Sequence, residues 1–506
     1  MKKSMILFTV FTLFFLVSCG GGSNENGGDT APDGDTTDTG DSGDTTADTG
    51  DTAPDGDTGE TETDADATDT GDIGPDADEG DTEDPALIQA YSVADAHAEA
   101  VSAEIVKANT RLGLNIFEKL AVGKHENIMI SPLSISIAMV MAANGTENES
   151  LAEMKEVLGY GEMELPAVNE QFRELIASLV SADKDLVLEI ANSIWLDDAI
   201  ADEIKEEFIA VLEDSYDAEL FEADFGDDAT VELINSWVAE KTHGKIDKII
   251  DGIGPESVMH LINAVYFKAT WSVAFDKDAT FNREFILSDG TKTDADYMGF
   301  FSNEKNMGIT YGNYVISGQN VASVRIPYGR DAFAFYAYVA NPDYGTPEDE
   351  VIGVDEIIGK IVEKGLEWYL SFAKHIDYTI RLPKFKFEYN KSLKNVFESL
   401  GLEKLFGSGG MSAAAPSLYV SGITHKTYID VNEEGTEAAA VTDIDVGDTG
   451  DEGPNRFQGF YGKRPFFFFI RDERNGTILF MGKVERPEYE EWFLNFRFRS
   501  KVRNFY

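Results

Sequence analysis

Three observations predict an α+β fold for most of this 506-residue chain. From about Ala103 to Pro487, roughly 385 residues mix segments of helical apolar period with segments of strand-like period two. These segments do not alternate regularly as strand, helix and strand, which would indicate a parallel α/β sheet. The stretch is also long enough to bury a substantial core. We therefore expect one large domain with a mixed sheet and packed helices.

The first elements of this domain have clear boundary signals. Residues 105–120 have the spacing of an amphipathic helix. Ser131 and Pro132 then form a helix start, with Ser as the cap and Pro at the first helical position, followed by a buried helix over 134–143. Further strand-like runs are 186–196, 258–268, 378–387 and 426–431, and further helical runs are 235–241 and 392–400.

The chain starts with an export signal over residues 1–18. Lys2 and Lys3 precede a 13-residue apolar run, Met5 to Val17, which is too short to span a bilayer but suits a signal peptide. Leu16-Val17-Ser18-Cys19 resembles the cleavage box of bacterial lipoproteins. That resemblance implies a lipid on Cys19, and the absence of Asp at position 20 favours the outer membrane or the cell surface.

Residues 19–98 have the composition of a tether. Between Gly20 and Asp95 there are 24 acidic residues and no Lys or Arg, and one eight-residue sequence occurs at 29–36 and again at 51–58. So few apolar residues cannot offset the entropy of the chain, so we expect a disordered, self-repelling segment. Calcium binding is the alternative, but we find no Asp-x-Asp-x-Asp-Gly loop with a closing Glu, so we predict no metal site.

Charge and residue counts narrow the function classes. The net charge of −52 disfavours nucleic acid and anionic membrane surfaces as partners. Cys19 is the only cysteine, so the domain has no internal disulfide. The sequence contains six histidines and no Gly-x-Ser-x-Gly, His-Glu-x-x-His or Walker-type motif. We therefore expect neither an enzyme nor a cofactor.

The segment after the strand-like run 425–431 has a pattern that fits both a sheet strand and an exposed loop. From Thr436, alternate positions are small or apolar, and the positions between them are mostly polar: the first set is Thr436, Ala438, Ala440, Thr442, Ile444 and Val446. The segment leads into an acidic, Gly-rich stretch, 447–455, that predicts an exposed loop. It could therefore be a hairpin arm, or a mobile loop that also pairs as a strand.

Residues 432–440, Asn-Glu-Glu-Gly-Thr-Glu-Ala-Ala-Ala, resemble the reactive-loop hinge of serpins, the serine-protease inhibitor family. Five more stretches resemble serpin sequences in the family's order: 127–135, 234–246, 261–271, 382–386 and 479–484. Two features depart from the family. Gly462 and Lys463 stand where an apolar residue and Asp or Asn are usual, and the loop is about five residues longer than expected.

The resemblance implies an inhibitor that traps its target covalently. A serine protease would cut the loop, form an acyl-enzyme and be dragged away as the loop inserts into the main sheet. The hinge residues implied are Glu433, Gly435, Thr436, Ala438, Ala439, Ala440 and Thr442. A polar latch between the central strands would consist of Ser131, Ser134, Asn263 and His425, with Trp271 where insertion begins. We expect His425 to bond the Ser and Asn side chains.

Counting along the loop as inhibitory serpins do places the reactive bond at Thr449–Gly450, which suits an elastase-like protease. Asp448, Asp451 and Arg456 are alternatives because the loop is long. Insertion is expected to run to Val446 or Gly447. The alternative function is a non-inhibitory serpin, a surface binding or chaperone-like module, although such proteins typically have bulky, charged or Pro hinge residues.

Residues 488–506 extend beyond the usual end of the family. Aromatic residues alternate there with Arg and Lys, which could form a docking or membrane-surface peptide, an added sheet edge or a disordered tail. We expect a monomer consisting of the signal peptide, the tether, a serpin domain over 103–487 and this extension.

Overall fold

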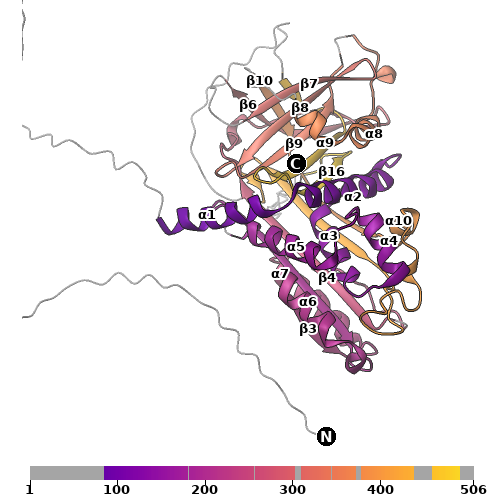
Figure 1. Cartoon of the computed structure of the whole chain (residues 1–506). Coiled ribbons are helices and arrows are strands. Elements are labelled where there is room, and N and C mark those ends of the chain that lie inside the picture. Colours follow the sequence, from indigo (N-terminus) through magenta and orange to yellow (C-terminus); the bar gives the residue numbers. More distant parts are fainter. Residues whose placement is uncertain are drawn as a thin grey trace, which may run out of the picture. The chain divides into compact units, whose positions relative to one another are not determined.

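The computed structural model describes residues 85–180, 182–255, 257–302, 309–342, 345–371, 378–437 and 459–489 (Figure 1). All of them belong to one compact unit, Glu79–Tyr506, and Met1–Asp78 is a separate unit. Several predicted site residues lie outside the described residues. These are Cys19, Ala438, Ala439, Ala440, Thr442, Asp448, Thr449, Gly450, Asp451 and Arg456.

Ten α-helices lie in the described part of the chain. Ser131 caps the third, where its Oγ accepts the Ser134 N–H at 3.1 Å and Pro132 takes the first position, as the sequence predicts. The helices are α1 Pro85–Ala100, α2 Ala103–Ala121, α3 Pro132–Ala143, α4 Asn148–Leu158, α5 Leu165–Leu179, α6 Glu206–Tyr216, α7 Asp228–Lys241, α8 Val354–Lys364, α9 Leu366–Leu370 and α10 Lys394–Ser399.

Three sheets complete the α+β fold, and helices α3 to α7 gather around β4 at one end of it (Figure 1). Sheet 1 has the strand order β11 (Phe385–Ser392), β12 (Thr424–Asn432), β13 (Gly435–Thr436), β4 (Met259–Thr270), β2 (Leu186–Asp197), β3 (Ala218–Ala223). Sheet 2 has the order β1 (Ile128–Ile130), β16 (Ile478–Val484), β15 (Phe466–Asp472), β9 (Phe333–Ala340), β8 (Gln319–Tyr328), β7 (Thr310–Ile316). Sheet 3 has the order β14 (Gly459–Tyr461), β10 (Tyr378–Pro383), β6 (Lys292–Ser302), β5 (Phe281–Ile286).

The central strands of sheet 2 form the middle of the core. Every residue of β9 and β16 is buried, as are six of the seven residues of β15. Strands with both faces covered are typically continuous apolar runs, and Phe466 to Ile470 is such a run. Sheet 1 packs against this buried sheet, with the ring of Phe267 in β4 lying 6.0 Å from that of Phe480 in β16.

Two sequence predictions need correction. The run 378–387 is not one strand: β10 pairs in sheet 3 and β11 in sheet 1, and the chain changes sheet at Lys384, whose N–H donates to the Asp296 carbonyl at 2.8 Å. The prediction that a disordered tether extends to residue 98 is wrong for residues 85–98, which belong to α1. This helix packs on α5 and buries Tyr91, Ala94 and Ala98, which share one helical face.

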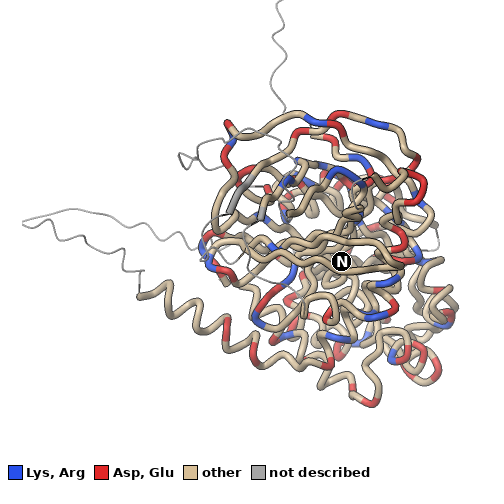
Figure 2. The backbone as a smooth tube through the Cα atoms, turned by 90° about the horizontal axis from the view of Figure 1, so that it is seen from above, with Lys and Arg blue, Asp and Glu red and all other residues tan. Residues whose placement is uncertain are grey.

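Charged residues of both signs are interspersed along the described chain (Figure 2). Among the described residues, none of the helices has the length and apolar content needed to cross a bilayer.

Candidate functional site: a strand slot in sheet 1

The candidate site is the position between β4 and β12, here called the slot. At one end, the hinge end, it holds the two-residue strand β13, which pairs antiparallel with both neighbours. Gly435 faces Thr270 and Asn432, and Thr436 faces Ala269 and Val431. Since β13 is antiparallel to both strands, β4 and β12 are parallel to each other. The slot can therefore accept a longer antiparallel strand.

Both residues of β13 fit this position for local reasons. A Cβ at Gly435 would collide with the Ala269 carbonyl, so only glycine fits there. Thr436 faces the interior with 3% exposure, and its hydroxyl lies 2.6 Å from the Tyr328 hydroxyl. The inward direction agrees with the period-two interpretation of the sequence. The first residue of the small, apolar face is thus already inside the sheet.

The ladder ends at Glu437. Its N–H still donates to the Asp430 carbonyl at 2.7 Å, but its φ of +59° turns the chain out of the strand conformation. The Glu437 carboxylate, 6% exposed, lies 2.6 Å from the Lys245 ammonium in the segment that follows α7. The strand therefore ends directly after the first inward residue, Thr436.

The residues before β13 are held by buried polar contacts. Glu433 pairs with Lys384 at 3.1 Å and accepts the Thr280 hydroxyl at 2.6 Å. The side chains of Glu433 and Lys384 are only 6% and 8% exposed. Phe275 N–H donates to the Glu433 carbonyl at 2.8 Å, and Glu434 pairs with Lys277. Either charge of the Glu433–Lys384 pair would be costly to bury alone. Each side chain therefore holds the other in place.

Trp271 completes the hinge end. Its backbone N–H donates to the Glu434 carbonyl and its indole Nε1–H to the Asn432 carbonyl, both at 2.9 Å. Its ring stacks on Tyr328 at a centroid distance of 4.5 Å. Trp271 therefore lies where β13 begins, as its predicted role at the start of insertion requires.

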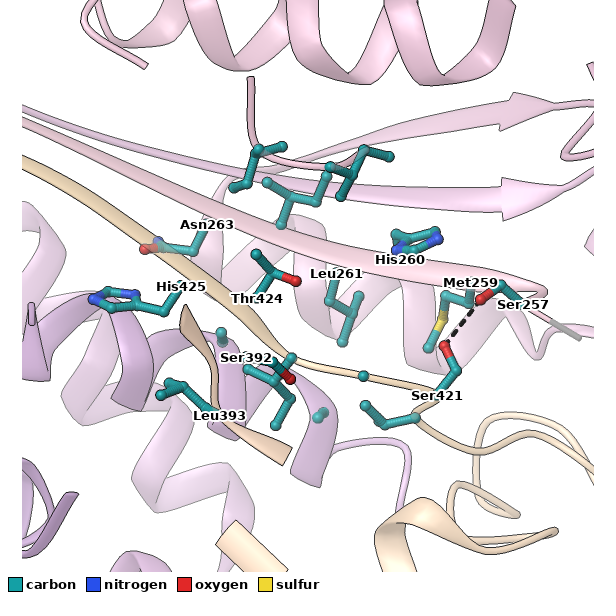
Figure 3. A pocket seen from close by; sticks show the side chains of 18 of the residues that line it. Ser257, Met259, His260, Leu261, Asn263, Ser392, Leu393, Ser421, Thr424 and His425 are labelled. Carbon is teal, nitrogen blue, oxygen red and sulfur yellow. Dashed lines mark hydrogen bonds between the residues drawn. The ribbon is translucent and has the colours of Figure 1, made fainter. Parts of the chain in front are cut away.

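The other end of the slot, the cavity end, adjoins a cavity of about 570 Å³. Residues of β4, α3 and the segment leading into β12 line it, with Asn263 and His425 on neighbouring strands (Figure 3). The hydroxyls of Ser257 and Ser421 lie 3.0 Å apart and join the two sides (Figure 3). This end is thus less completely filled than the hinge end.

His425 and its neighbours differ in their bonding from the predicted latch. His425 Nε2 accepts the backbone N–H of Ser131 at 3.0 Å, not its hydroxyl. The Ser131 hydroxyl instead caps α3 through Ser134 and donates to the Leu479 carbonyl at 2.7 Å. Because His425 is buried, its pKa falls from 6.5 to about 4, so the ring is neutral at pH 7.

Asn263 has an unused hydrogen-bond acceptor. Its Nδ2 donates to Asn192 Oδ1 at 2.7 Å, but its buried Oδ1 has no partner among the described residues. Structures rarely leave such an atom unsatisfied without a functional reason. The five predicted latch residues thus separate into Ser131, Ser134, His425 and Asn263 at the cavity end and Trp271 at the hinge end.

Sequence reasoning missed several residues at this site: Asn192, Thr280, Tyr328 and, above all, Lys384. Lys384 lies within the stretch 382–386 that carries the family resemblance, so its position was visible but its partner was not. No group of His, Cys, Asp or Glu that could hold a metal occurs among the described residues.

Comparisons with known proteins agree with this geometry. The family model Serpin, serine protease inhibitor, matches residues 107–487. Iripin-2 of Ixodes ricinus is 32% identical over 392 residues, covering 76% of this chain and 94% of that protein. A serpin-like protein of Methanosarcina mazei is 30% identical, covering 76% of this chain and 88% of that protein.

Among solved structures, the native state of the thermophilic serpin tengpin matches with a TM-score of 0.64 and 31% identity, covering 75% of this chain and 94% of that chain. The latent state of tengpin matches with a TM-score of 0.61 and 29% identity, covering 76% and 98%. Thyroxine-binding globulin in complex with thyroxine matches in fold, with a TM-score of 0.64 and 24% identity over 76% and 99%. The chain belongs to the serpin family.

Proposed function

We propose that this chain inhibits a serine protease by a suicide mechanism, in which the cut loop inserts into the slot and traps the protease. The observation that carries the proposal is β13: Gly435 and Thr436 already occupy the first positions of a strand between β4 and β12. Membership of a family described as serine protease inhibitors supports the same class of function. The protease supplies the nucleophile, and this chain supplies the bait and the strand.

Continuing the register of β13 supports insertion of the whole segment. Each further loop residue moves one position back along β4 and β12, so Thr442 would face Asn263 and His425. Val446 would then face Met259, the first residue of β4, which agrees with the predicted end of insertion. Even-numbered positions would point inward with Thr436, and these are the small and apolar ones.

The cavity end has the polar group that such a strand needs. An inward Thr442 would bring a hydroxyl donor between Asn263, whose Oδ1 is unsatisfied, and His425. Satisfying a buried acceptor and filling the cavity both favour the inserted state. Loop insertion would therefore release free energy, which is what moving a bound protease requires.

The partner we propose is a serine protease with a small apolar specificity pocket, because counting from Glu433 as inhibitory serpins do would place the cut after Thr449. Asp448, Asp451 and Arg456 stay open as alternatives. A panel of proteases followed by mass spectrometry of the cleaved chain identifies the bond.

We also propose that the protein is exported and anchored in the outer membrane or at the cell surface by lipid on Cys19. The support is the signal-like segment and its Leu-Val-Ser-Cys box. Cys19→Ala is expected to move the protein from the membrane fraction to the soluble fraction of its source cells. Unchanged membrane association would contradict the anchor.

The test of inhibition uses Thr436→Arg with Thr436→Ser as its matched control. Thr436 is buried against Tyr328, so an arginine there cannot enter the sheet without leaving a buried charge unpaired. The parent and the Ser variant should form a denaturant-resistant complex with an elastase-like protease, and the Arg variant should be cut as a substrate. An Arg variant that traps protease as well as the parent would contradict the mechanism. Absence of any complex across the panel would favour the non-inhibitory binding module.

A further inference from the structure

The chain continues past Val484, the last residue of β16, along the edge of sheet 1. Asn127 Oδ1 accepts the N–H groups of Glu485 and Arg486 at 2.8 and 2.9 Å, and Asn127 Nδ2 donates to the Arg486 carbonyl at 2.7 Å. Two residues later, the Lys386 N–H in the edge strand β11 donates to the Glu488 carbonyl at 2.9 Å. The first residues of the C-terminal extension are therefore fixed beside β11.

This path brings the Tyr489 ring to the hinge end of the slot. The Lys384 ammonium lies 4.1 Å from the centroid of the ring, which is half-buried. The same ammonium pairs with Glu433 at 3.1 Å, three residues before Thr436. Burial and the nearby Asp430 carboxylate raise the pKa of Tyr489, so its hydroxyl keeps its proton. The aromatic face thus covers one side of the cation that holds the hinge.

We propose that the start of the C-terminal extension, Glu488 and Tyr489, is a clamp on the hinge, with Tyr489 as a positioning residue that holds Lys384 against Glu433. Holding the Glu433 side chain in place also positions the hinge backbone. The backbone carbonyls of Glu433 and Glu434 accept the N–H groups of Phe275 and Trp271. The contact itself is independent of the proposed function. Its consequence, restraint of loop insertion until the loop is cut, rests on the proposed function.

The expected size of the effect follows from the contact. A cation over an aromatic ring is stabilised by the ring's electron density, and the ring also keeps water from the Lys384–Glu433 pair. Removing the ring should raise the equilibrium constant for local opening of the hinge roughly threefold to thirtyfold, which is the range expected for the loss of one cation–π contact. Phenylalanine keeps the ring over Lys384 and loses only the hydroxyl beside Asp430 and Asn432, so it should keep most of the clamp.

Hydrogen exchange of the intact chain tests the proposal without a target protease. In Tyr489→Ala, the amides of Trp271 and Phe275, which donate to the hinge, should exchange roughly threefold to thirtyfold faster than in the parent. Amides of β15 should be unchanged, and Tyr489→Phe, which keeps the ring, should be much closer to the parent than to Tyr489→Ala. Tyr461→Ala is the matched control, because it removes a ring that lies 5.2 Å from another cation, Arg381, in sheet 3.

A double-mutant cycle shows whether the ring acts through Lys384. With Lys384→Met as background, Tyr489→Ala should give no further acceleration at Trp271 and Phe275. Three results would overturn the proposal: unchanged exchange at these two amides in Tyr489→Ala, equal acceleration in β15, or a Tyr489→Phe variant that behaves like alanine. Because exchange is measured on the uncut chain, none of them bears on whether the cut loop inserts.

Discussion

The two ends of the slot are built differently. At the hinge end, residues Asn432 to Thr436 are held by the buried Glu433–Lys384 ion pair, backbone hydrogen bonds and the stacked rings of Trp271 and Tyr328. At the cavity end, a pocket of about 570 Å³ that is partly open to solvent adjoins the slot, and a buried acceptor on Asn263 has no partner among the described residues. One end fixes where a strand must begin, and the other leaves room and a binding partner for its continuation.

Under the proposed mechanism, this difference corresponds to a native state that is folded but not at its lowest free energy. Cavities and unsatisfied polar atoms destabilise a fold, while specific contacts at a hinge prevent the change that would remove them. A single cut in the loop would leave the contacts at both ends unchanged and would free the loop to insert, as proposed above. If the proposed insertion occurs, the cavity end would supply the driving force and the hinge end would control when it is released.

The largest effect is expected at the Glu433–Lys384 pair. Glu433→Gln leaves a buried ammonium without its carboxylate and should lower the free energy of unfolding by about 3 kcal/mol, because a buried charge loses its partner. Glu363→Gln, in an exposed pair with Lys360, is the control and should show no measurable change. Urea unfolding measures both variants. Equal, small effects would mean that the hinge end is no better fixed than the surface.

A smaller effect is expected from pH at the cavity end. The pKa of His425 is about 4 in the fold and 6.5 without burial, so the unfolded chain binds more protons between these values. The neutral His425 therefore makes its full contribution to the free energy of unfolding above pH 6.5. That contribution falls as the pH drops toward 4, by about 2 kcal/mol between pH 7 and pH 5.

Comparing the parent with His425→Gln isolates this contribution from the many carboxyl groups. The difference in unfolding free energy between pH 7 and pH 5 should be smaller in the variant by that amount. An identical pH dependence in both proteins would mean that His425 is not held neutral against the Ser131 N–H.

The smallest effect is expected where Ser257 and Ser421 join the two sides of the cavity. Ser421→Ala removes one hydrogen bond of 3.0 Å and should destabilise the uncut protein by about 1 kcal/mol. Ser399→Ala, on the exposed end of α10, is the control and should be close to neutral. If Ser421→Ala lowered the free energy of unfolding as much as Glu433→Gln, the cavity end would be as strongly stabilised as the hinge end, which would contradict this comparison.

Local signals in the sequence predicted much of the fold. The Ser131-Pro132 pair fixes the start of α3, and the two-residue period from Thr436 gives the direction of its side chain correctly. The break of 378–387 into two strands was missed, because it depends on pairing with β6 and β12, far away in the sequence. Helix α1 was missed because the acidic composition before it outweighed the spacing of Tyr91, Ala94 and Ala98.

The candidate site was predictable in its positions but not in its bonds. The residues near the slot lie in stretches that resemble the family, yet which groups pair depends on side chains brought together by the fold. The Ser131 hydroxyl is taken up by the α3 cap and Leu479, so His425 bonds the backbone instead. Lys384 and Tyr489 meet through two chain segments about a hundred residues apart, and no local pattern shows such a contact.

Thermal unfolding before and after a cut in the loop near Thr449 by a promiscuous protease tests the central claim most directly. If the cut loop inserts as a strand between β4 and β12, the melting temperature rises strongly, and Thr436→Arg shows no such rise. An unchanged melting temperature in the cut parent would contradict insertion, and with it the proposed inhibition by trapping.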